Sequence, residues 1–180
     1  MNRHRLSFVL LLGALLLGLV VAPRLRAAAP PIVINEVLAG NATTNLDPQF
    51  TNYAPWVELY NAGPTAVNLG GYRLSDDAGN PAGYALPAST SIPAGGRLLL
   101  WYDEEATGTH TNLSLDMRGD TIALFMPDGT LVDTLTYGTL LNGETLVDVS
   151  YGRTSDGAGT WAYFDAPTPG AANGGGLAAA

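Results

Sequence analysis

The sequence Trp56-Val57-Glu58-Leu59-Tyr60-Asn61 carries the clearest structural signal in this chain. Large β-branched and aromatic residues alternate with other residues, and turn-forming residues lie on both sides, which is typical of a β-strand. Because successive side chains of a strand point to opposite faces, Val57 and Leu59 should share one face. Trp56, Glu58 and Tyr60 should lie on the other.

A second stretch, Ile32-Val33-Ile34-Asn35-Glu36-Val37-Leu38, resembles the first: each has a glutamate among large apolar residues and an asparagine close by. No long window shows the 3.6-residue apolar spacing of a helix. Short apolar or alternating runs recur instead between Gly, Pro, Asn and Asp, and about ten such runs predict a β-sandwich or barrel. The further runs are residues 66–69, 72–74, 83–86, 97–101, 112–115, 121–126, 131–137, 147–151 and 161–164.

The amino-terminal residues 1–29 have the pattern of a signal peptide: a basic start, an apolar run over residues 6–21 and small residues before Pro30. An uncleaved transmembrane anchor is the alternative, although a span needs about 20 apolar residues. Both interpretations predict that the domain lies outside the cytoplasm, secreted or at the cell surface. Four of the eight basic residues precede Pro30 and all sixteen acidic residues follow it, so the mature charge is four minus sixteen, or −12.

The remaining chain is expected to form one domain over residues 30–173, followed by a flexible Gly/Ala tail over residues 174–180. Cysteine is absent, so a disulfide framework is excluded. Residues 39–53 form the longest polar connection, and a loop of this length is often functional. In the run 131–137, Asp133 shares a face with apolar residues, which indicates either a β-bulge or an edge strand.

Several motifs follow one another in a characteristic order. They are Ile34-Asn35-Glu36-Val37, Trp56-Val57-Glu58-Leu59-Tyr60-Asn61, Val67-Asn68-Leu69-Gly70-Gly71-Tyr72-Arg73-Leu74-Ser75-Asp76, Ile92-Pro93-Ala94-Gly95-Gly96, Asp128-Gly129-Thr130-Leu131-Val132-Asp133, Ser150-Tyr151-Gly152-Arg153 and Pro167-Thr168-Pro169-Gly170-Ala171-Ala172-Asn173. In this order they resemble the lamin tail domain family, most closely its exported bacterial members. The resemblance implies an all-β, immunoglobulin-like β-sandwich that has no catalytic activity. The chain has no heptad segment, so filament assembly is not implied.

Glu36 and Glu58 are the sharpest candidates for chemistry. If their strands are neighbours, the two carboxylates could form a catalytic or metal-binding pair. The alternative, which we favour, is that each accepts hydrogen bonds and fixes a corner of the sandwich. Asn35 and Asn61 are interpreted as turn or bulge residues. Together with Trp56, these residues are predicted to form a structural motif.

Other chemistry has weaker support. No catalytic motif surrounds a serine, and His110 is interpreted as a solvated loop residue. No cofactor is expected, and no metal beyond a weak calcium hypothesis, since two acidic loops offer oxygen ligands. These loops supply Asp76, Asp77, Asp103, Glu104 and Glu105. Three tryptophans, at positions 56, 101 and 161, could form a sugar-binding platform, although tryptophans within strands are more often part of the core.

The sequence therefore predicts an exported, non-catalytic module that mediates attachment or protein interaction at the cell surface, through a strand edge or the 39–53 loop. The alternatives are the targeting module of a truncated extracellular hydrolase and a calcium-dependent adhesion domain. Nucleic acid is not an expected partner, because four scattered arginines and no lysine oppose sixteen acids. A membrane is not an expected partner either, unless residues 1–29 remain as an anchor.

Overall fold

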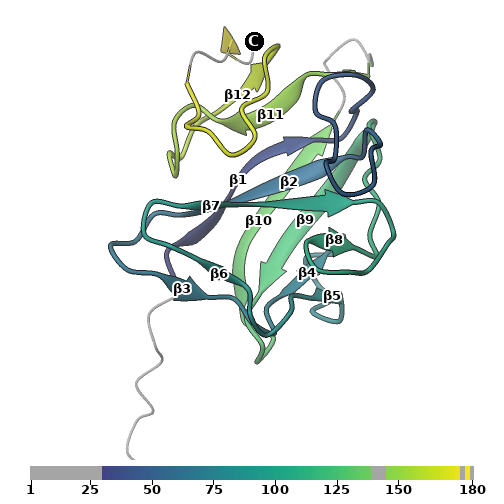
Figure 1. Ribbon diagram of the computed structural model, residues 1–180. Helices are drawn as coiled ribbons and strands as arrows, with labels where there is room; N and C mark the ends of the chain where they lie inside the picture. The colour runs from purple at the N-terminus through teal and green to yellow at the C-terminus, as the bar shows by residue number, and fades with distance from the viewer. Residues whose placement is uncertain (1–29, 139–144, 175–176, 179–180) are drawn as a thin grey trace, which may run out of the picture.

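The structure is a computed structural model that describes residues 30–138, 145–174 and 177–178 (Figure 1). The predicted signal peptide or anchor at residues 1–29 lies outside the described residues, as does most of the predicted tail. The described chain forms thirteen strands and no helix, so the all-β prediction is confirmed. Among these residues no helix is long and apolar enough to span a bilayer.

The strands form three sheets. The largest has the order β13-β12-β11-β1-β2-β7-β8, with bounds Leu177–Ala178, Trp161–Phe164, Ser150–Arg153, Ile32–Leu38, Trp56–Asn61, Arg97–Tyr102 and His110–Thr111. The second has the order β10-β9-β4-β5, with bounds Leu131–Gly138, Gly119–Phe125, Arg73–Ser75 and Tyr84–Ala85. A small third sheet pairs β3 (Val67–Asn68) with β6 (Ser91–Ile92). All pairs are antiparallel except β7 with β8.

The two larger sheets pack face to face, with β9 and β10 behind β1 and β2 in Figure 1. Val57 and Leu59 lie in the main apolar core, together with residues of β1, β4, β7 and β9. Trp56 is fully buried on the opposite face of β2, in a smaller cluster with Leu38, Ala54 and Trp101. The structure thus bears out the predicted division of this strand into two faces, and both faces are covered.

Some predicted strands are displaced. Residues 112–115 are not a strand; the strand in this region is β8, two residues earlier. Leu113 and Leu115 still pack against the core from an irregular segment, so their apolar spacing imitates a strand. The predicted run 147–151 is observed as Ser150–Arg153. The two-residue strands β6 and β13 were not expected, since two residues carry no periodic pattern.

Asp133 has both of the features that its irregular pattern indicated. Strand β10 lies at the edge of its sheet, and its register with β9 shifts between Leu131 and Asp133. The Asp133 carboxylate accepts hydrogen bonds from the Ile34 backbone N–H at 2.8 Å and from Arg153 Nη2 at 3.0 Å. This side chain therefore joins the edge of one sheet to the centre of the other.

Candidate functional site

Glu36 and Glu58 lie opposite each other in the register of β1 and β2 and have no exposed surface. Strand β1 is irregular between Ile34 and Glu36, so Asn35 occupies a bulge, as predicted for this residue. The Glu36 carboxylate accepts hydrogen bonds from the Ser150 hydroxyl and from Thr168, whose N–H lies at 3.0 Å and whose Oγ1 lies at 2.7 Å. These contacts bind the irregular segment 165–173 to the outer face of the sheet.

Glu58 accepts a hydrogen bond from Asn35 Nδ2 at 3.0 Å and another from the Gly170 N–H at 2.7 Å. Arg97 Nε lies 3.6 Å from its Oε1. The pKa of Glu58 is raised from its ordinary 4.5 to about 7. Burial is the largest cause and the neighbouring Glu36 carboxylate acts in the same direction, whereas Asn35, Gly170 and Arg97 lower the pKa. The desolvation of the carboxylate therefore outweighs its favourable partners.

Asn173 and Asp156 complete this buried polar network. Asn173 Nδ2 donates to the carbonyl oxygens of Asn35 at 3.2 Å and Arg153 at 2.8 Å. Asp156 accepts a hydrogen bond from Asn35 Nδ2 at 3.0 Å and forms an ion pair with Arg97. Because both glutamates are enclosed by the chain itself, this arrangement fits a structural clamp better than a catalytic pair, which needs access to a substrate.

Asn61 terminates β2 by satisfying backbone groups of the turns that follow. Its Nδ2 lies 2.8 Å from the Thr65 carbonyl oxygen, and 3.0 Å from those of Ile92 and Pro93. Its Oδ1 accepts a hydrogen bond from the Gly63 N–H at 2.9 Å. One buried side chain thus joins the end of β2 to two turn segments, 63–65 and 92–93, at this end of the sandwich.

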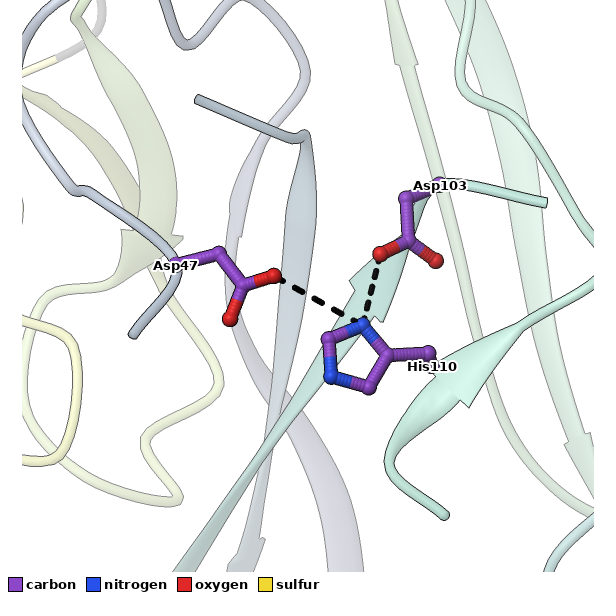
Figure 2. Close-up of side chains that lie close together, drawn as sticks. All are labelled: Asp47, Asp103 and His110. Carbon is purple, nitrogen blue, oxygen red and sulfur yellow. Dashed lines mark hydrogen bonds and ion pairs between the residues drawn. The ribbon is translucent and has the colours of Figure 1, made fainter. Parts of the chain in front are cut away.

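Asp47, Asp103 and His110 form a second polar cluster at the other end of β2, and sequence reasoning missed it. Figure 2 shows that carboxylate oxygens of both aspartates point at the same ring nitrogen of His110. His110 Nδ1 lies 2.6 Å from Asp103 Oδ2 and 3.8 Å from Asp47 Oδ2. Asp47 comes from the 39–53 loop, Asp103 follows β7, and His110 begins β8.

The prediction that His110 is solvated is wrong, since the residue is only 1% exposed. The Phe50 ring meets the imidazole edge-on at 4.6 Å, and the Trp101 ring lies nearly parallel to it at 6.5 Å. Trp101 and His110 are also partners in the β7–β8 register. In the sequence, only the short separation of seven residues between Asp103 and His110 hinted that these two side chains could meet. Asp47 lies far from both in the sequence, so only the fold shows that it joins them.

Of the five acidic residues in the calcium hypothesis, only Asp103 belongs to a group of potential metal ligands among the described residues. Only Asp47, Asp103 and His110 form a group of three potential metal ligands within the part of the chain that the structure describes. Asp103 therefore gathers with residues outside both loops. Asp76, Asp77, Glu104 and Glu105 are exposed. Asp77 accepts a hydrogen bond from the Gly79 N–H at 2.8 Å, as in an ordinary polar turn.

The tryptophans do not form an exposed platform. Trp56 has no exposed surface, and Trp101 is 6% exposed. Trp161 is half-buried; it stacks on Tyr151 at 5.3 Å, and the Arg153 guanidinium lies 4.7 Å from the centre of its ring. The favoured interpretation, tryptophans within the core, therefore holds for Trp56 and Trp101, and the sugar-platform alternative does not.

The sheets and their core define an immunoglobulin-like β-sandwich. A family model described as Lamin Tail Domain matches residues 26–139, and the chain belongs to this family of non-catalytic, immunoglobulin-like interaction modules. No curated protein matches the chain. Strands β11 and β12 and the segment that binds Glu36 and Glu58 follow the matched residues, yet they complete the large sheet and its polar clamp.

Proposed function

We propose that this protein is an exported, non-catalytic module that binds a protein partner at the cell surface through its 39–53 loop. Export is supported by the signal-like pattern of residues 1–29, and a negative formal charge keeps an extracellular domain soluble. Burial of the Glu36–Glu58 pair supports the absence of catalysis. The observation that carries the proposal is the apolar surface of this loop.

Three large apolar side chains of the loop remain exposed: Leu46 by 48%, Phe50 by 38% and Tyr53 by 43%. The 39–53 loop therefore presents three large apolar side chains to solvent. Exposed aromatic residues are enriched in protein interfaces, where they contribute large contact areas. The loop extends beyond the ends of β1 and β2, so a partner can approach it without disturbing either sheet (Figure 1).

The loop is also anchored to the sandwich, which reduces the entropy lost on binding. Asn41 Nδ2 donates to the carbonyl oxygens of Asn45 at 2.6 Å and Ala54 at 2.8 Å. Asp148 accepts hydrogen bonds from the Ala42 and Thr43 N–H groups, at 2.7 and 3.0 Å. Hydrogen bonds to the carboxylate hold the pKa of Asp148 well below its ordinary value, the Thr43 N–H contributing most.

An affinity measurement with paired variants tests this proposal. Proteins that the immobilised chain retains from envelope and secreted fractions are purified, and the affinity of each is measured. Leu46→Ser and Tyr53→Ser should each lower the affinity of the partner at least about fivefold, because an apolar anchor at the centre of an interface contributes more than about 1 kcal/mol. Leu131→Ser is the control, since Leu131 is 42% exposed at the far end of β10. Equal losses in all three variants, or none, would contradict the proposal.

A further inference from the structure

We propose that Asp47, Asp103 and His110 bind a divalent transition-metal ion, with Zn²⁺ as the best fit, and that this ion fastens the 39–53 loop to β7 and β8. One potential ligand atom from each residue lies within 4.8 Å of the other two. The site goes beyond the proposed interaction role, because metal binding can be measured without a protein partner.

The first argument is charge. Asp47 has no exposed surface, and the side chains of Asp103 and His110 are only 4% and 2% exposed. Two buried carboxylates beside one imidazole leave at least one negative charge uncompensated, even when the imidazole is protonated. Such a charge is costly unless a cation pairs with it. A divalent cation bound by a neutral imidazole and two carboxylates makes the group electrically neutral.

Arginine does not supply this charge within the part of the chain that the structure describes. The four arginines there have other partners: Arg73 donates to the Gly83 carbonyl oxygen, Arg97 pairs with Glu58 and Asp156, Arg118 pairs with Asp116, and Arg153 pairs with Asp133. Backbone N–H groups do approach the carboxylates. Those of Gln49 and Phe50 donate to Asp47 at 2.8 and 3.2 Å, and that of Glu105 donates to Asp103 at 3.4 Å. They orient the oxygens but carry no net charge.

The second argument is geometry. With metal–ligand distances near 2.1 Å, tetrahedral ligands lie about 3.4 Å apart. The two distances from His110 Nδ1, 2.6 and 3.8 Å, lie on either side of that value. A shift of less than about 1 Å in each carboxylate would place both at bonding distance from one ion. The Phe50 ring packs edge-on against the imidazole and the Trp101 ring lies nearly parallel to it, and these neighbours restrict the orientation of the nitrogen.

The third argument selects the metal. Calcium and magnesium prefer ligand sets made only of oxygen, whereas zinc accepts imidazole nitrogen together with carboxylate oxygen. Three protein ligands leave the fourth position for water or for a carboxylate of a partner. Residues 104–108, which connect Asp103 to His110, are exposed, so the cluster lies beside a solvent-facing segment.

Calorimetric titration of the full chain, after treatment with EDTA, tests the inference. We expect one Zn²⁺ per chain, a higher melting temperature in Zn²⁺ than in Ca²⁺, and a visible Co²⁺ absorption band of a nitrogen–oxygen site. Loss of an outer-sphere partner alone costs metal affinity about 10–100-fold, so Asp47→Asn and Asp103→Asn should each weaken Zn²⁺ binding by at least that much. Glu104→Gln, an exposed neighbour, is the matched control and should bind like the parent.

A second measurement separates a metal site from an ordinary hydrogen-bonded cluster. Asparagine removes the charge but turns an amide N–H toward one of the N–H groups that donate to Asp47, so melting temperatures in EDTA give each variant its own metal-free baseline. Zn²⁺ should then raise the melting temperature of the parent and leave those of the Asn variants near their baselines. A melting temperature that Zn²⁺ raises no more in the parent than in the two Asn variants would overturn the inference. So would a parent chain that takes up no Zn²⁺ at 100 µM, that binds Ca²⁺ in preference, or that binds Zn²⁺ equally after both substitutions.

Discussion

Replacing Glu58 with glutamine should change the pH dependence of folding stability. The folded-state pKa of Glu58 is about 7, against an ordinary value of 4.5 that applies to the unfolded chain. Because the folded value is raised, the stability linked to protonated Glu58 is fully present below pH 4.5 and is lost as the pH rises through about 7. At 1.36 kcal/mol per unit, the difference amounts to at most about 3 kcal/mol.

Glutamine cannot ionise, so Glu58→Gln removes this pH-dependent contribution. It also leaves one of the donors from Asn35 and Gly170 facing an amide N–H, which costs about 1–3 kcal/mol. The variant should therefore be clearly less stable than the parent near pH 4.5 and close to it above pH 8. Urea unfolding at several pH values measures both curves. Parallel curves between pH 4.5 and 8 would refute the assignment, and Glu104→Gln provides an exposed control.

Three further predictions concern the core, the clamp and nucleic acid. Trp56→Ala should lower the free energy of unfolding by about 3–5 kcal/mol because the ring is fully buried, whereas Tyr53→Ala should change it by less than about 0.5 kcal/mol; equal urea midpoints would contradict this. Gly152→Ala should cost about 1–3 kcal/mol, since its Cβ would lie 3.0 Å from Glu36 Cγ, and a variant as stable as Gly159→Ala, which has open space, would count against a tight clamp. The full chain should not retard DNA in a gel at about 150 mM salt and micromolar protein, and a salt-sensitive shift would mean that its arginines converge.

The sequence predicts the strands best where large apolar residues alternate over at least four positions. The first and last of the long predicted strands, Ile32–Leu38 and Trp161–Phe164, have the predicted bounds. Their side chains must be buried on at least one face, so the two-residue period is strong. The prediction of a strand at residues 112–115 was wrong because burial alone can produce the same period. Leu113 and Leu115 both pack against the core, but their backbone is irregular.

The two polar clusters were not equally predictable. Glu36 and Glu58 stand out locally, since a glutamate in an apolar strand needs partners. Their partners Thr168 and Gly170 come from a segment more than a hundred residues further along the chain, so only the fold identifies them. His110 offered no such signal, because its surroundings in sequence are small and polar while its partners in space are aromatic and acidic.

Photo-cross-linking on the cells that make the protein tests the interaction role most directly. A photoreactive amino acid replaces Tyr53 in the exposed loop or, in a parallel chain, Leu131 at the opposite end of the sandwich. The proposed function predicts that position 53 gives one abundant adduct with a surface protein and that position 131 does not. The same adduct from both positions, or no protein adduct from position 53, would contradict it.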